Sequence, residues 1–429
     1  MKKLILLLLI CFTSIVARAQ VCDIKGDWTG KLSVYGTEIP LVFHFDGEEC
    51  TMDSPDQGAR GISAKLERTA TGIKVAVPSI NANYEGVNMG DSVMGTFKQN
   101  GLSLPLTLKP GSVKRNRPQT PTPPYPYQTQ EVSFCNGDAV LKGTLATPEN
   151  VSSQTPVLLM VTGSGLQNRD EEFFEHKPFA VIADALARQG IATLRYDDRG
   201  FGESTGDLAN ITTEDLKNDA LAGVELLRKQ FKRVGILGHS EGGTIGLMLA
   251  AEGKVDFVVS LAGMVVSGEK TLLEQNRWML GHSGYPQEVV DRYCTALESL
   301  FDGLKAGGNL EPVTDGLPTE LAKNLPVVKV QSGTPYMRHF LGLDLTDRLG
   351  KITCPVLALN GTKDRQVSSD ENLNTLRSGL AGRKEIHAID GLNHLFQHCN
   401  TGDTSEYKDI EETFAPEVLG IIVAWMKGL

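Results

Sequence analysis

The sequence has 429 residues and a net charge of −10 at neutral pH, with 41% hydrophobic and 22% charged residues. This composition is typical of a globular protein, and the length suggests two domains. The acidic balance argues against a nucleic-acid partner, which selects basic surfaces, and against binding to an anionic membrane surface.

The first nineteen residues have the pattern of a secretory signal peptide. Lys2-Lys3 precedes an apolar run that begins at Leu4 and ends at the small-residue motif Ala17-Arg18-Ala19. The run is too short for a comfortable membrane span, and no other stretch reaches the roughly 18 consecutive apolar residues that a span requires. We predict that residues 1–19 are removed, which changes the net charge to −13. The mature chain is then a bacterial periplasmic or secreted protein without a membrane span; an uncleaved N-terminal anchor is the alternative.

Residues 20–113 contain short β-like stretches separated by turns rich in Gly, Asn and Asp, and no stretch has a sustained helical period. We predict a small all-β domain, either a barrel or a sandwich. Examples of the predicted strands are Gly30–Tyr35, Ile39–Phe45, Gly61–Leu66, Gly72–Val77, Ser92–Lys98 and Leu104–Leu108.

Six cysteines follow the signal region, at positions 22, 50, 135, 294, 354 and 399. Export would permit disulfides, but the sequence does not select a pairing. Cys22 with Cys50 is one candidate pair, because both lie in the N-terminal region, and free buried thiols are the alternative. The chain has no C-x-x-C motif and no Cys/His cluster, so we predict no metal site.

Residues 114–128 separate the two predicted domains. Five prolines occur in the fourteen residues from Lys114 to Tyr127, which excludes a helix or an interior strand. We predict a semi-rigid linker. The alternative is an irregular segment that packs on a domain surface, which Tyr125 and Tyr127 would favour.

Residues 129–429 alternate apolar strands with amphipathic helices, the pattern of a parallel sheet covered on both faces. The predicted strands are Pro156–Val161, Ile191–Tyr196, Val234–Leu237, Phe257–Leu261, Val356–Asn360 and Lys384–Ile389. The predicted helices are Lys177–Gln189, Thr213–Lys229, Gly242–Ala251, 370–379 and 414–427. Residues from about 265 to 350 interrupt this alternation, and we predict that they form an inserted helical cap.

Two pentapeptides match G-x-S-x-G, a pattern that holds a nucleophilic serine on a tight turn between a strand and a helix. In Gly238–Gly242, Ser240 follows an apolar strand directly and precedes a helix rich in small residues. In Gly202–Gly206, Ser204 lies between polar loop residues. We therefore predict that Ser240 is the nucleophile and that Ser204 is a loop residue.

A serine nucleophile needs a histidine base, and the base needs a carboxylate that orients it. After a serine turn of this kind the acid and then the histidine follow along the chain. His394 comes just after the last predicted strand, where a loop can reach over the sheet edge, and His398 is the alternative. Asp364 follows the preceding strand, although it could instead be a turn residue. Asp390 is too close to His394 along the chain to be preferred.

Acyl transfer also needs backbone N–H groups that stabilise an oxyanion. One should come from the residue after the nucleophile, Glu241, and the other from the glycine-rich loop at residues 162–166. We predict Ser164 as this second donor, with Leu166 as the alternative. A carboxylate directed at the oxyanion would oppose catalysis, so we expect the Glu241 side chain to point away or to pair with a cation such as Arg199. If it faces the pocket instead, it could bind a substrate amine.

Together these motifs resemble the α/β-hydrolase superfamily over about residues 130–429, in particular its bacterial serine esterases and S33-type aminopeptidases. The matching stretches are Gly163–Asp170, Tyr196–Gly202, Gly238–Gly243, Gly361–Asp364 and Gly391–His394. The usual His-Gly before the oxyanion loop is Thr162-Gly163 here, a form that similar esterases share. The resemblance implies an α/β-hydrolase fold, hydrolysis of small-molecule carboxylic esters, and no cofactor.

We therefore predict a serine hydrolase that forms an acyl-enzyme through Ser240, Asp364 and His394. A peptidase or aminopeptidase of the same fold is one alternative, with Glu241 holding the α-amine. A non-catalytic ligand-binding protein, in which the β-rich domain is the working part, is the other. No pattern in the sequence specifies the acyl group, the alcohol group or the oligomeric state.

Overall fold

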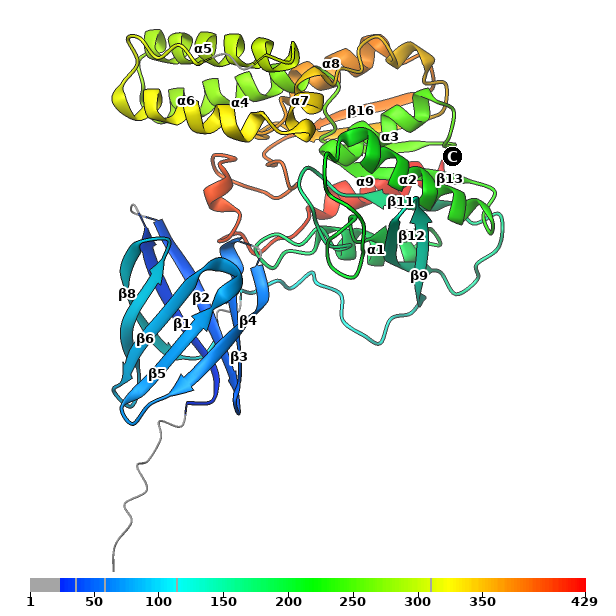
Figure 1. The fold of residues 1–429 in the computed structure, drawn as a ribbon. Coiled ribbons are helices and arrows are strands. Elements are labelled where there is room, and N and C mark those ends of the chain that lie inside the picture. The colour runs from blue at the N-terminus through cyan, green and yellow to red at the C-terminus, as the bar shows by residue number, and fades with distance from the viewer. Residues whose placement is uncertain (1–23, 35–36, 58, 113–114, 309–310) are drawn as a thin grey trace, which may run out of the picture. The chain divides into compact units, whose positions relative to one another are not determined.

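The computed structural model describes residues 24–34, 37–57, 59–112, 115–308 and 311–429. The chain divides into two compact units, Met1–Arg115 and Asn116–Leu429 (Figure 1). The predicted signal peptide and Cys22 lie outside the described residues, so export stays a prediction. The described cysteines are free thiols, at positions 50, 135, 294, 354 and 399.

The first unit is a closed barrel in which each strand pairs with the next in antiparallel fashion and β8 closes on β1. Its strands are β1 (Gly26–Val34), β2 (Thr37–Asp46), β3 (Glu49–Ser54), β4 (Ala59–Arg68), β5 (Gly72–Val77), β6 (Ala82–Asn88), β7 (Val93–Gln99) and β8 (Leu102–Pro110). Two short 3-10 helices, η1 (Pro55–Gln57) and η2 (Pro78–Ile80), connect strands at one end. The predicted all-β domain is confirmed, although β3 and β6 were not among the predicted strands.

Residues 116–127, the proline-rich segment, belong to the second unit and pack against the rest of it. Arg117 donates hydrogen bonds to backbone carbonyls of loops that are distant in the sequence. Gln119 exchanges hydrogen bonds with the backbone just before the last helix, and the Tyr127 hydroxyl donates to Asp184. The segment is therefore irregular and packs on a surface, as in the alternative considered above.

The second unit contains an eight-stranded sheet with the order β16-β15-β14-β13-β11-β12-β10-β9. Strands β11 to β16 run parallel to one another, while β9 and β10 form a hairpin that pairs antiparallel with β12 at one edge. The strands are β9 (Gln128–Asn136), β10 (Ala139–Thr147), β11 (Val157–Val161), β12 (Ala192–Tyr196), β13 (Val234–His239), β14 (Val258–Leu261), β15 (Val356–Gly361) and β16 (Lys384–Ile389). All the parallel strands were predicted, but the hairpin was not.

Helices cover both faces of this sheet because side chains alternate between its faces. Along β11, Leu159 and Val161 pack into one hydrophobic core with α2 and α3, while Leu158 and Met160 pack into another with α1 and α9. The covering helices are α1 (Pro178–Ala187), α2 (Thr213–Arg228), α3 (Glu241–Ala251), α8 (Ser369–Gly379) and α9 (Pro416–Lys427). Each lies within a few residues of its prediction.

The predicted cap is a group of helices between β14 and β15. It consists of α4 (Gly268–His282), α5 (Gln287–Lys305), α6 (Thr319–Ser332) and α7 (Pro335–Gly342). The cap has its own hydrophobic core, in which Tyr293, Leu297 and Phe301 of α5 are central, because apolar residues spaced by four positions share one helix face. The predicted α/β architecture with an inserted helical cap, after a small β domain, is confirmed.

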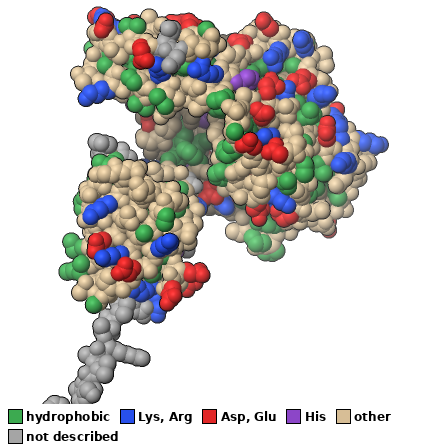
Figure 2. Space-filling model, viewed as in Figure 1, with side chains coloured by type: hydrophobic (Ala, Val, Ile, Leu, Met, Phe, Trp, Pro, Cys, Tyr) green, Lys and Arg blue, Asp and Glu red, His purple; other side chains and the backbone are tan. Residues whose placement is uncertain are grey.

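Acidic and basic side chains are interspersed on the face of the molecule in Figure 2. Within the described part of the chain, no helix is both long and apolar enough to span a bilayer. The same residues contain no group of three or more His, Cys, Asp or Glu side chains that could hold a metal ion.

Candidate active site

Ser240 stands on the turn between β13 and α3 with a strained backbone, at φ 51° and ψ −119°. A residue other than glycine adopts such a positive φ only when the surrounding structure imposes it. The flanking glycines show what imposes it. A Cβ on Gly238 would lie 2.0 Å from the carbonyl oxygen of Gly242, and a Cβ on Gly242 would lie 2.0 Å from that of Val161. The turn is therefore packed so closely that these two positions accept only glycine.

Ser204 has a different environment. Its side chain is buried, its hydroxyl donates to the Asp197 carbonyl at 2.7 Å, and the same oxygen accepts from the Lys142 N–H at 2.9 Å. The hydroxyl thus donates one hydrogen bond and accepts another, and together they tie the loop after β12 to strand β10. Ser204 is a structural loop residue.

Asp364 and His394 come from the loops that follow β15 and β16, and the structure brings them into contact. Asp364 Oδ2 lies 2.7 Å from His394 Nδ1, and the aspartate side chain has no exposed surface. Its other oxygen, Oδ1, accepts hydrogen bonds from the backbone N–H groups of Gln366 and Val367 at 2.8 and 2.9 Å. The carboxylate is held at both oxygens, so it fixes the imidazole with Nε2 as the ring nitrogen left for other partners.

The alternative residues have other partners. The His398 ring nitrogens pair with Glu412 and Glu417 on the surface, and Asp390 accepts a hydrogen bond from Thr362. Neither His398 nor Asp390 lines the cavity that contains Ser240.

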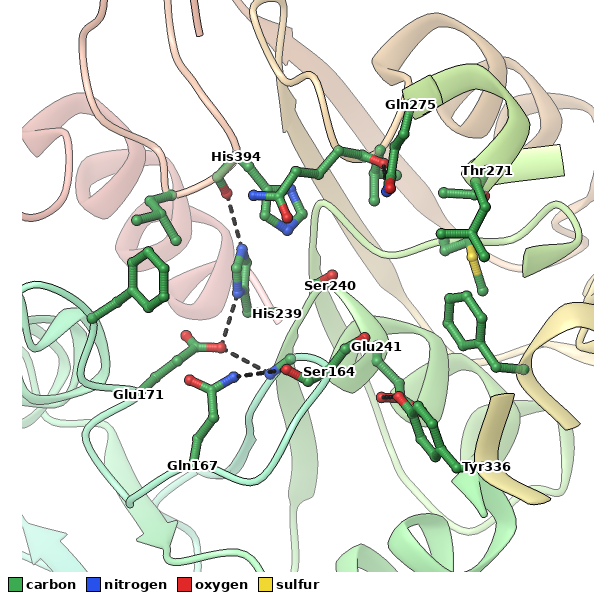
Figure 3. A pocket seen from close by; sticks show the side chains of 18 of the residues that line it. Ser164, Gln167, Glu171, His239, Ser240, Glu241, Thr271, Gln275, Tyr336 and His394 are labelled. Atoms are coloured by element: carbon green, nitrogen blue, oxygen red, sulfur yellow. Dashed lines mark hydrogen bonds and ion pairs between the residues drawn. The ribbon is translucent and has the colours of Figure 1, made fainter. Parts of the chain in front are cut away.

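A cavity of about 320 Å³ joins Ser240 and His394 at the carboxyl edge of the sheet (Figure 3). Its floor includes Ser164 and Glu241 from the body of the unit. The cap supplies a largely apolar wall from α4 and α7, formed by Leu272, Met337 and Phe340 together with Thr271, Gln275 and Tyr336. The cap therefore determines what size and shape of group can reach Ser240.

Both residues predicted to donate backbone N–H groups line this cavity, whereas Leu166 does not. Glu241 is the first residue of α3, where N–H groups have no acceptor inside the helix. The neighbouring N–H of Gly163 is already used, because it donates to Glu171 Oε1 at 2.8 Å. Ser164 and Glu241 therefore line the cavity beside Ser240, and the Gly163 N–H between the strand and this loop is not free.

The Glu241 side chain lies beside the cavity and is only 2% exposed. Its carboxylate accepts a hydrogen bond from the Thr213 hydroxyl at 2.7 Å and another from the hydroxyl of Tyr336 in the cap. Burial raises the pKa of Glu241, while hydrogen bonds from Tyr336, Thr213 and the Ser164 hydroxyl partly oppose that rise. The carboxylate is satisfied by hydroxyl groups rather than by a cation.

The expected pairing of Glu241 with Arg199 is wrong. The Arg199 guanidinium forms a bidentate ion pair with Asp219 on α2, at 2.7 and 2.6 Å. Planar guanidinium and carboxylate groups match in this geometry, and the pairing holds the loop after β12 against α2 instead of reaching the nucleophile.

A buried pair that sequence reasoning missed joins the parts of the site. Glu171 Oε1 accepts from the Gly163 N–H and lies 2.9 Å from His239 Nδ1, and His239 Nε2 lies 2.9 Å from the carbonyl oxygen of His394 (Figure 3). Burial lowers the pKa of His239, but the Glu171 carboxylate and the His394 carbonyl outweigh this effect, so the pKa is raised overall. A protonated imidazole can donate at both nitrogens.

This pair connects three segments that are far apart in the sequence: the loop after β11, the end of β13 and the loop after β16. Glu171 also has a positive φ of 53°, which is uncommon for a residue of this type. One signal was present in the sequence, because Glu171 directly follows the Gly163–Asp170 motif and His239 directly precedes Ser240.

Similar sequences and structures are known for the second unit. The family model described as the alpha/beta hydrolase family matches residues 158–403. Esterase EstD of Thermotoga maritima is 30% identical over 262 residues, which cover 59% of this chain and 58% of that esterase. Proline iminopeptidase of Mycobacterium smegmatis is a similar solved structure, with a TM-score of 0.45 and 17% identity over 70% of this chain and 98% of the other. Est1E of Butyrivibrio proteoclasticus has a TM-score of 0.40 and 16% identity over 70% and 96%.

The match to the family covers more than half of the chain, and it includes the β13–α3 turn and the loops that carry Asp364 and His394. The chain belongs to the α/β-hydrolase family.

Proposed function

We propose that this chain is a serine hydrolase that cleaves small carboxylic esters, with Ser240 as nucleophile, His394 as base and Asp364 as the group that orients the base. One observation carries the proposal: a serine on a strained turn lines the same cavity as a histidine whose other ring nitrogen is held by a buried carboxylate. The similarity to an esterase at 30% identity supports an ester as the substrate.

The reaction follows from these positions. His394 Nε2 removes the proton from the Ser240 hydroxyl as its oxygen attacks the ester carbonyl carbon. The backbone N–H groups of Ser164 and Glu241 stabilise the resulting oxyanion, an effect typically worth about 10²–10³ in rate per donor. The intermediate collapses when His394 returns the proton to the leaving alcohol. Water, activated by the same base, then hydrolyses the acyl-enzyme.

Glu171 and His239 act as positioning residues in this proposal. The Glu171 carboxylate holds the loop that carries the Ser164 donor, through Gly163, and His239 holds the backbone of His394. The oxyanion donors and the base are therefore tied to one buried ion pair, which favours preorganisation of the site.

The surroundings of Glu241 favour an ester over an α-amino substrate. A carboxylate that binds a substrate ammonium must offer an oxygen to the cavity. Glu241 is almost fully buried, and its carboxylate accepts hydrogen bonds from the hydroxyl groups of Thr213 and Tyr336. The apolar cap wall and the volume of about 320 Å³ suit a short uncharged acyl group.

A panel of p-nitrophenyl esters with acyl chains of increasing length, beside aminoacyl p-nitroanilides, tests the proposal on the full chain. We expect turnover of short-chain esters and little turnover of the anilides. A fluorophosphonate probe should label the wild type and Ser204→Ala but not Ser240→Ala. Unchanged labelling of Ser240→Ala, or faster turnover of anilides than of esters, would show that the proposal is wrong.

A further inference from the structure

The β-barrel of the first unit is filled at one end and hollow at the other. At the filled end the buried Tyr84 hydroxyl donates to the carbonyl oxygens of Val93 and Leu106 at 2.9 and 3.2 Å, and the tilted ring of Phe43 packs beside the tyrosine ring, with centroids 5.7 Å apart. At the end that carries η1 and η2, a cavity of about 380 Å³ remains inside the barrel. Eight-stranded barrels have an interior that side chains just fill or that holds one small ligand.

The wall of this cavity, which we call the barrel cavity, is mainly apolar. Branched aliphatic side chains of four strands form most of it, among them Val34, Ile39, Ile62 and Leu104. These side chains are only partly buried, although the alternation of each strand directs them inward. A ligand that covers these side chains removes apolar surface from water, which favours binding.

The polar groups of the barrel cavity are few and uncharged. They belong to Ser54, Gln57 and Gln99, and no lysine, arginine, histidine or acid lines the described wall. The Ser54 hydroxyl donates to Gln57 Oε1, and the Gln99 amide donates to the Ile80 carbonyl. These bonds leave the Gln57 amide N–H and Gln99 Oε1 for a polar group of a ligand.

We propose that the barrel cavity binds one neutral, mainly apolar small molecule, such as a medium-chain alcohol or its ester. A fatty-acid carboxylate is disfavoured, because an ion taken out of water needs a partner of opposite charge. Arg115, which contacts η1 at this end, already forms an ion pair with Asp56. The volume lies within the range of about 300–1,000 Å³ that is typical of small-molecule sites. The proposal concerns the first unit and does not depend on the ester chemistry at Ser240.

Titration of the full chain with the neutral fluorescent probe N-phenyl-1-naphthylamine tests this site. Leu104→Trp should fill the barrel cavity and weaken probe binding by about tenfold or more, which corresponds to about 1.4 kcal/mol. Ser103→Trp is the matched control, because the neighbouring side chain on β8 is exposed and points away from the interior, and it should leave the Kd unchanged. Ile80→Trp, at the rim in η2, gives a second filling variant if Leu104→Trp loses its β-sheet circular dichroism.

Competition then tests the chemistry of the ligand. We expect 1-decanol to displace the probe, and decanoate at neutral pH to displace it about tenfold less effectively or worse, because the two share a ten-carbon chain and only decanoate carries a charged head group. Equal probe binding by the wild type and both filling variants would overturn the site. Equal competition by the alcohol and the carboxylate would overturn its assignment to neutral ligands.

Discussion

Two regions of this chain, Gly202–Gly206 and Gly238–Gly242, share the pattern G-x-S-x-G but place their serines in opposite environments. Ser240 sits on a strained strand-to-helix turn and lines the cavity. Ser204 is buried in a loop, where its hydroxyl has two backbone partners. The pattern alone therefore does not identify a nucleophile, and the flanking strand and helix are what give it meaning.

The glycines of the two pentapeptides are required for different reasons. At Gly238 and Gly242 the neighbouring backbone leaves no room for a side chain, because an added Cβ would lie only 2.0 Å from a carbonyl oxygen. At Gly202 and Gly206 the backbone itself has φ of 55° and 148°, which favours glycine in a loop. The first pair allows a helix to start directly against the sheet, whereas the second allows a loop to turn.

The largest effect should come from Ser240→Ala. Loss of the proposed nucleophile should lower kcat/KM for p-nitrophenyl acetate by about 10⁴–10⁶. The matched variant Ser204→Ala should stay within about threefold of the wild type. Steady-state kinetics measure both variants. Equal losses of kcat/KM would contradict the contrast between the two serines.

Asp364→Asn should have the next largest effect, about 10⁴ in kcat, because an amide cannot hold the His394 ring in the required tautomer. Asp390→Asn, which changes an aspartate in the loop before the same histidine, should have little effect. Near-normal kcat in Asp364→Asn would remove this aspartate from the mechanism.

Glu171→Gln should lower kcat by about 10–100-fold, since hydrogen bonds to charged groups are worth about 1.5–3 kcal/mol. KM should change less than kcat, because the lost interaction positions the oxyanion loop and the base rather than the substrate. The neighbouring Glu172→Gln serves as the control. A kcat within twofold of the wild type would show that the buried pair with His239 has no part in positioning.

Ser204→Ala should be visible in stability rather than in rate. It removes the acceptor of the Lys142 N–H inside the protein, which should lower the free energy of unfolding by about 1–3 kcal/mol. Denaturant titration of Ser204→Ala and Ser240→Ala measures this effect. A larger loss of stability in Ser240→Ala would contradict the contrast between the two serines.

The last prediction concerns only the pH dependence of stability, at Asp198 in the loop that precedes Ser204. Burial raises the pKa of Asp198 to about 8, while its value in the unfolded chain is about 3.9. The raised pKa makes stability fall as the pH rises from about 4 to about 8. Asp198→Asn imitates the neutral carboxyl and lacks this loss. Its Tm should match the wild type near pH 4 and exceed it increasingly as the pH rises toward 8, and parallel Tm–pH curves would refute the shift.

Local patterns in the sequence were sufficient for much of the architecture. Apolar runs predicted every parallel strand, and the strand-glycine-serine-glycine-helix context separated Ser240 from Ser204. Asp364 and His394 were selected because each follows a strand of the same sheet, and the carboxyl ends of parallel strands meet at one edge. These inferences depend on neighbours in the chain and on one rule of topology.

Only the tertiary structure revealed the partners of Glu241 and Arg199, the Glu171–His239 pair and the barrel cavity. Each depends on side chains that are far apart in the sequence and meet after packing, so no local period encodes it. The hairpin of β9 and β10 was missed for a related reason: β9 is largely exposed at the sheet edge, and a weakly buried strand has little hydrophobic pattern. The sequence by itself determined the features that depend on neighbouring residues, whereas the tertiary structure decided those that depend on residues far apart in the chain.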